Sequence, residues 1–187
     1  MLKYSIITLL AVLFLTRTYA FDPMKGPARH VSVQITNPLS AASKIGGVLE
    51  IRLIQSSFNF GFTNYSGVYQ GKQYKFEYQK YIKTQYRNEY FWYLKAFGGD
   101  AMYVSSKLEM IGDKSDVKVG PLNYFGGGAG FGRRFNLNHF CILVNCGLKY
   151  AVLPENLSDE NREYFRLFYA TGPGSILDLN LRLGYQF

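Results

Sequence analysis

The chain has 187 residues, a length that suits one domain, with a formal net charge of +8 and 17% aromatic residues. Its lysines and arginines are scattered among tyrosines and glutamates rather than gathered in a patch, which disfavours nucleic acid as a partner. The positive balance instead suits anionic lipid or the phosphates of lipopolysaccharide.

Residues 1–20 have the pattern of a secretory signal peptide. Lys3 provides a basic start, residues 6–15 form an apolar run, and Ala20 is a small residue before the expected cut. A helix of this run would be about 15 Å long, too short for a hydrocarbon core of about 30 Å. The sequence therefore predicts a cleaved leader, 1–20, and a folded domain, 21–187.

The remainder divides into segments of about ten residues separated by turn-rich stretches, and most of the segments alternate between apolar and polar residues. The eight segments are 29–35, 47–55, 58–65, 75–83, 89–98, 122–132, 140–150 and 176–187. The segment 75–83 mixes residue types, so a short helix is an alternative there.

The connections predict two different ends of a barrel. Every second connection is short at one end of the predicted barrel, namely 55–57, 84–88 and 133–138. Three of the four connections at the other end are long. The long ones are 64–74, 100–120 and 152–174, and the remaining connection, around 37–43, is short. Short turns at one end and longer loops at the other are typical of outer-membrane barrels. In the last loop, Ser158 and the acids after it favour a helix start, with a strand extension over 158–170 as the alternative.

The closing segment sets leucines and aromatic residues on one face and polar residues on the other. The interior of an eight-stranded barrel is just wide enough to be filled by side chains, and the large apolar residues would overfill it. We therefore expect the apolar face outside and a charged, filled lumen that is not a pore. The expected lumen charges are Glu50, Arg52, Glu89, Lys95, Lys149, Asp178 and Arg182. A soluble lipocalin-like periplasmic carrier, with its apolar face inside, is the alternative.

Two further sequence patterns are better explained by a structural role than by ligand binding or catalysis. Cys141 and Cys146 lie five positions apart in one strand, so they face opposite sides about 17 Å apart and can share neither a disulfide nor a metal. In the GGGAGFG stretch, four glycines share one face, which leaves room for bulky neighbours or for strong strand coiling: Gly126, Gly128, Gly130 and Gly132. No helix pattern follows them, so a phosphate loop is disfavoured, and no cofactor or metal is predicted.

One pair of residues carries a catalytic alternative. His30 and Ser32 lie two apart, hence on one strand face, where a histidine can activate a serine nucleophile. The pair resembles the arrangement in outer-membrane lipid A deacylases, with Glu50 as a conceivable orienting acid. Its position on the polar face opposite two valines favours a lumen-facing, structural pair instead. His139 is expected in a turn.

The closing strand, the rhythm of eight segments and the size resemble the OmpA/OmpX-like small outer-membrane barrels. The stretches NPL, VLEIRL, GGGAGFG and LRLGYQF are closest to a family of short outer-membrane barrels of unknown function. The resemblance implies an all-β, eight-stranded antiparallel up-and-down transmembrane barrel in the bacterial outer membrane, without catalytic residues. It also implies that the barrel-assembly machinery reads the last strand through Leu183, Tyr185 and Phe187. We expect a monomer with a structural or loop-mediated role.

Overall fold

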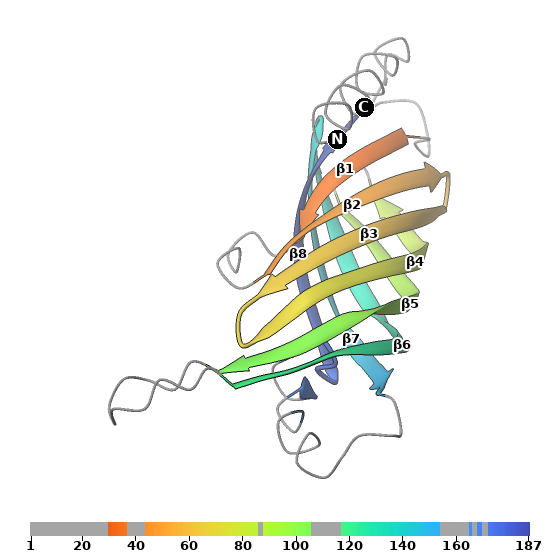
Figure 1. Cartoon of the computed structure of the whole chain (residues 1–187). Coiled ribbons are helices and arrows are strands. Elements are labelled where there is room, and N and C mark those ends of the chain that lie inside the picture. The colour runs from red at the N-terminus through yellow and green to blue at the C-terminus, as the bar shows by residue number, and fades with distance from the viewer. Residues whose placement is uncertain are drawn as a thin grey trace.

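Eight antiparallel strands close into a barrel in which each strand pairs with the next and the last pairs with the first (Figure 1). The computed structural model describes residues 30–36, 44–85, 88–105, 117–153, 165, 168–169 and 172–187. The strands are β1 (His30–Thr36), β2 (Lys44–Leu53), β3 (Ser56–Ser66), β4 (Tyr69–Gln85), β5 (Asn88–Ser105), β6 (Val117–Leu137), β7 (Phe140–Val152) and β8 (Leu177–Gln186). The predicted all-β, up-and-down topology is confirmed.

The barrel has two ends that differ in their connections, a turn end and a loop end. The turn end carries the connections β2–β3, β4–β5 and β6–β7, the start of β1 and the end of β8. The loop end carries the other four connections. At the turn end, Ile54–Gln55 and Asn138–His139 are two-residue turns, and Ile54 and Asn138 have positive φ. Short connections were predicted at this end, and these two are confirmed.

Several element boundaries differ from the sequence-based expectation because the strands are longer than ten residues. The stretch 75–83 is part of β4, so the helix alternative is wrong. The predicted loop 64–74 is also wrong, since β3 and β4 extend until only Gly67–Val68 separate them. The predicted turn 133–138 belongs mostly to β6, which runs to Leu137. Strands β5 and β6 likewise take over both ends of the predicted loop 100–120.

Other expectations fall outside the described residues. These are the leader 1–20, the connection 37–43 and most of the stretch 158–170. Among the described residues, no helix is long and apolar enough to span a bilayer.

The strands expose their apolar face and bury their polar face. On β8, Leu179 is 61% exposed whereas Arg182 is 0% exposed, and on β2, Ile51 is exposed whereas Glu50 is buried. Cys141 is buried and Cys146 is exposed, and both are free thiols, as the spacing predicted. The outward apolar face therefore has no covering layer within the described chain.

The glycines of β6 accommodate rings from β5. Gly130 pairs with Tyr93, and Gly132 pairs with Phe91. A Cβ on Gly132 would lie 2.3 Å from the Phe91 ring, and a Cβ on Gly130 would lie 2.7 Å from the Tyr93 hydroxyl. Because no side chain stands on these glycines, the rings can lie across the inside of β6, as predicted for this stretch.

Candidate functional site

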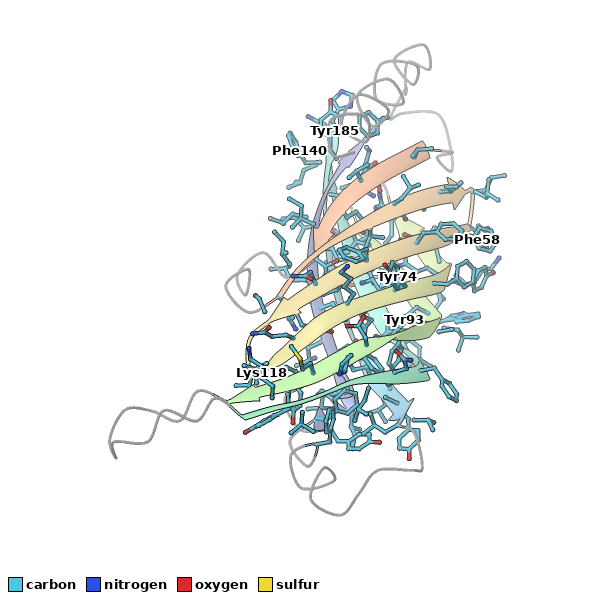
Figure 2. The ribbon with its side chains drawn as sticks, viewed as in Figure 1. Phe58, Tyr74, Tyr93, Lys118, Phe140 and Tyr185 are labelled. Atoms are coloured by element: carbon cyan, nitrogen blue, oxygen red, sulfur yellow. The ribbon has the colours of Figure 1, made fainter. Side chains whose placement is uncertain are left out.

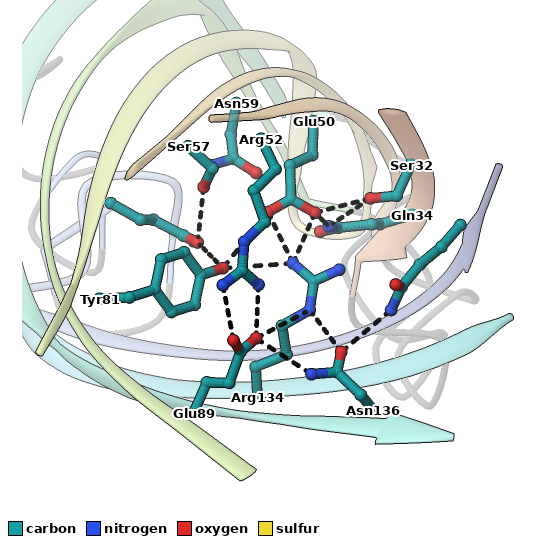
Figure 3. A network of polar contacts seen from close by, with 12 residues as sticks. Ser32, Gln34, Glu50, Arg52, Ser57, Asn59, Tyr81, Glu89, Arg134 and Asn136 are labelled. Carbon is teal, nitrogen blue, oxygen red and sulfur yellow. Dashed lines mark hydrogen bonds and ion pairs between the residues drawn. The ribbon is translucent and has the colours of Figure 1, made fainter. Parts of the chain in front are cut away.

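The lumen contains a continuous polar network, and its turn-end part is centred on Glu50 of β2 (Figure 3). Arg134 of β6 donates from Nη1 to both carboxylate oxygens of Glu50, at 2.7 and 2.8 Å. The Ser32 hydroxyl and the Gln34 amide of β1 donate to Glu50 Oε2 at 2.7 and 2.8 Å. Both charged side chains are fully buried, so this ion pair lies in the interior of the barrel and is not exposed to solvent.

A second carboxylate lies beside the first pair. Glu89 of β5 accepts two hydrogen bonds from the guanidinium of Arg52, one of them at 2.6 Å from Nη2. Asn136 donates to Glu89 at 3.0 Å and accepts from Arg134 Nε at 2.9 Å. The Arg52 guanidinium also lies 3.9 Å from the ring centre of Tyr81. The two arginines and two carboxylates thus form one neutral, hydrogen-bonded layer.

Farther from the turn end, the lumen is crossed by longer side chains. Arg182 of β8 reaches Glu77 of β4 at 2.5 Å, and Gln79 donates to the same carboxylate at 2.6 Å. Tyr93 donates to Asp178 Oδ2 at 2.6 Å across 85 positions of sequence. These contacts connect opposite walls of the barrel and fill the space between them.

Asp178 is the acid nearest the loop end in this network. Lys95 lies 2.5 Å from Asp178 Oδ2, and Asn180 donates to Oδ1 at 2.7 Å. Lys149 instead donates to the backbone carbonyl of Pro173 at 3.0 Å. Each of the seven charges expected in the lumen is therefore placed inside it or at its loop end.

An aromatic cluster covers the lumen at the loop end. Phe168 is fully buried, and its ring lies 5.9 Å from the Tyr69 ring and 5.2 Å from the Tyr124 ring, both edge-on. Phe165 packs beside them, 5.9 Å from Phe168, and Phe97 packs on Tyr124. Apolar burial of this extent fixes the described part of the β7–β8 connection against the barrel.

The outer face carries aromatic residues toward both ends. At the turn end, Tyr78 lies between Phe58 and Trp92, with ring separations of 5.5 and 5.7 Å. Figure 2 shows Phe58 projecting away from the barrel wall. Toward the loop end, Phe62 and Tyr74 pair at 5.4 Å. Phe60 and Phe76 pair between these two groups at 5.3 Å, so the outward rings of β3 and β4 form one continuous aromatic stripe. Outward-facing aromatic residues of this kind are common on membrane barrels, which place them at both membrane interfaces.

The candidate catalytic pair gains no support as a nucleophilic site. Ser32 is fully buried on the lumen face, and its hydroxyl donates to Glu50, whose charge Arg134 already neutralises. The backbone of His30 pairs with Arg52, and its side chain lies outside what the structure describes. Because Ser32 is buried and bonded to a carboxylate whose charge is already neutralised, its hydroxyl is not accessible to a lipid substrate.

The three residues proposed as an assembly signal lie on the last strand or directly after it. Leu183 and Tyr185 face outward, and Phe187 packs on Tyr185 with the rings 5.0 Å apart. His139, in the predicted turn, stacks on Tyr185 at 5.8 Å. This end of the barrel therefore exposes a compact aromatic group.

Sequence reasoning missed central members of the network. Arg134 was assigned to a turn and Glu77 to the segment with mixed residue types, so neither was expected in the lumen. Arg134 could have been found by continuing the alternation of β6 two residues past the predicted end at Gly132. Glu77 lies within the predicted segment 75–83, between Phe76 and Tyr78, so alternation inside that segment already places it on the polar face.

Among the described residues, no group of three or more histidines, cysteines or acids could hold a metal ion. The described lumen contains instead paired charges and hydrogen-bonded polar side chains, which connect opposite walls of the barrel.

These features define the class of the protein as a closed eight-stranded barrel with an apolar exterior and a packed, charged interior, the OmpA-like fold. The structure is similar to the crystal structure of the N-terminal β-barrel domain of Pseudomonas aeruginosa OprF, with a TM-score of 0.54. That match covers 85% of this chain and 98% of the other at 11% identity. No family model and no curated protein sequence matches the chain. The narrower resemblance to short barrels of unknown function stays a prediction.

Proposed function

We propose that the protein is a non-conducting barrel of the bacterial outer membrane, where it acts as a structural scaffold or through its surface loops. The observation that carries this proposal is the opposition between the two faces of the wall. Leucines and aromatic rings face outward, whereas the arginines and carboxylates pair inside, as in Arg134 with Glu50. A soluble carrier needs the reverse, an apolar lumen and a polar exterior.

The same proposal includes export and assembly. Residues 1–20 act as the cleaved leader, and the aromatic group at Leu183, Tyr185 and Phe187 is read by the barrel-assembly machinery. The barrel is a monomer whose outer face contacts outer-membrane lipid and lipopolysaccharide. The lumen is filled by side chains, so the role lies in the wall or the loops and not in transport.

Membrane fractionation combined with a heat-modifiability gel tests the location. The folded protein should sediment with the outer membrane and migrate differently before and after boiling, while a periplasmic marker stays soluble. The intact mass of the isolated protein should correspond to residues 21–187. Recovery in the soluble periplasmic fraction would overturn the proposal.

A matched pair of variants tests the assembly signal. Phe187→Ala should lower the amount of folded barrel in the membrane, because it removes the final aromatic residue. Phe140→Ala removes a ring of the same aromatic group from the neighbouring strand, 5.3 Å from Tyr185, and should leave the amount unchanged. Equal loss in both variants would mean that the rings act only through packing.

A further inference from the structure

Asp178 of β8 is surrounded by lysines in the half of the lumen near the loop end. Four lysines interact with it electrostatically: Lys44, Lys75, Lys95 and Lys149. Lys95 forms the ion pair with Asp178, and Tyr93 and Asn180 donate to the two carboxylate oxygens. The acceptor atoms of this one acid are therefore already occupied.

Among the described residues, none of the other three lysines forms an ion pair, and the second acid that interacts with Lys75, Glu77, is already paired with Arg182. Lys149 donates to the neutral carbonyl of Pro173. Within the described part of the chain, neither Lys44 nor Lys75 makes a hydrogen bond or an ion pair. The turn-end half differs, because there each arginine has a carboxylate partner, as Arg52 has Glu89. Within the part of the chain that the structure describes, surplus positive charge in the lumen thus lies in the loop-end half.

The barrel wall makes room for these lysines. A Cβ on Gly61 would lie 2.3 Å from Cε of Lys75, and a Cβ on Gly128 would lie 2.7 Å from Cβ of Lys149. The side chains of Lys75 and Lys149 therefore occupy space that would be filled if a residue larger than glycine stood at position 61 or 128. Lys75 is 9% exposed, so its side chain is held inside the lumen, whereas Lys44 and Lys149 are half-buried.

A fully buried guanidinium adds unused donors to the same region. Arg182 interacts electrostatically with Lys75 and Asp178, and its Nε and Nη1 have no hydrogen-bond partner. Buried cations and donors without partners are costly, since they have lost water and gained nothing in return. A bound anion supplies both the acceptor atoms and the opposite charge.

The region is also shielded from the loop end. The Phe97 ring lies 5.5 Å from Nζ of Lys95 and 5.6 Å from Nζ of Lys149. Phe97 belongs to the aromatic cluster with Phe165 and Phe168. Exclusion of water by these rings lowers the effective dielectric constant and strengthens the attraction between the lysines and an anion.

We propose that Lys44, Lys75 and Lys149 bind one small oxyanion of the inorganic phosphate class inside the lumen. Ammonium groups act as compact point charges for phosphate, and a tetrahedral oxyanion offers an oxygen to each of them. Water would satisfy the hydrogen bonds but would leave the charge surplus uncompensated. The site faces the lumen, so a phosphate carried by a lipid, whose acyl chains lie outside the barrel, is not its source.

The test measures the thermal unfolding midpoint of the full-length barrel, refolded in uncharged detergent micelles. Inorganic phosphate is titrated while chloride keeps the ionic strength constant. The midpoint should rise and saturate, because a ligand that binds the folded state stabilises it as its concentration rises.

The double variant Lys75→Met/Lys149→Met should lose this rise. In the absence of phosphate it should unfold at or above the wild-type midpoint. Lys72→Met, exposed on the same strand, should respond as the wild type does.

Three results would overturn the proposal. The wild type could show no saturable response, which would mean that water alone hydrates the lysines. The double variant could respond as strongly as the wild type, which would place the anion elsewhere. Micelles containing phosphatidylglycerol could raise the midpoint while inorganic phosphate does not, which would identify a lipid headgroup as the source.

Discussion

Arg134 and Glu50 meet inside the barrel from positions 84 residues apart, with both carboxylate oxygens on one guanidinium nitrogen. The pair is fully buried, and Ser32, Gln34 and Tyr81 satisfy the remaining positions around the carboxylate. This relationship determines how the wall responds to substitution, because neither charge can reach water when its partner is removed.

Breaking this pair should destabilise the barrel strongly. Glu50→Gln removes the carboxylate bonded to Arg134 and leaves only Glu89, 3.9 Å from Arg134 Nε and already paired with Arg52, so we expect a loss of about 3–5 kcal/mol in the free energy of unfolding. The double variant Glu50→Gln/Arg134→Met removes both charges and should lose less than the sum of the two single variants. Urea unfolding of the barrel in lipid vesicles measures this cycle, and additive losses would show that the two residues are not coupled.

Alanine should be tolerated on one face of β6 and not on the other. Gly132→Ala places a methyl group against the Phe91 ring, and we expect it to cost about 1–3 kcal/mol through overpacking. Gly127→Ala faces outward, where the nearest atom is a carbonyl oxygen at 3.4 Å, and should change stability by less than about 0.5 kcal/mol. Unfolding midpoints of the two variants check the facing, and equal midpoints would contradict it.

A charged substitution on the outer face should cost more free energy of unfolding the deeper its position lies in the membrane. Leu179→Arg, on the exposed middle of β8, should cost about 2–4 kcal/mol in a bilayer. Leu137→Arg, beside the turn after β6, should cost about 0–1 kcal/mol, because the side chain reaches the interface. The free energies of unfolding in vesicles test this order. Equal costs for the two arginines would mean that the barrel does not lie across the bilayer as proposed.

Loss of the aromatic cluster should not open a channel. Phe168→Ala removes the ring packed between Tyr69 and Tyr124 and should make the β7–β8 connection easier to cleave by added protease. Single-channel recordings in planar bilayers should nevertheless show no stable conductance, for the wild type or the variant. The layer around Arg134 and Glu89 blocks the lumen independently. A steady conductance in the variant alone would make the aromatic cluster the seal.

The sequence by itself determined the class of fold and the facing of the wall. Alternation is a local property of a strand, so the outward position of Leu179 and the inward position of Asp178 follow from their neighbours in the chain. The volume of an eight-stranded lumen then decides which face is inside. Two further features could be predicted in the same way: the opposite facing of Cys141 and Cys146, and the inward face shared by Gly130 and Gly132 of β6.

Only the tertiary structure decided where the strands end and which charges meet. Strand β6 continues into the predicted turn because its backbone finds partners on both β5 and β7, and this extension brings Arg134 into the lumen. Pairing across the barrel depends on register and on the reach of side chains between opposite walls, which no local pattern records. The same closure gathers Lys44, Lys75 and Lys149 around a single acid, Asp178, because residues far apart in sequence come to share one enclosed space.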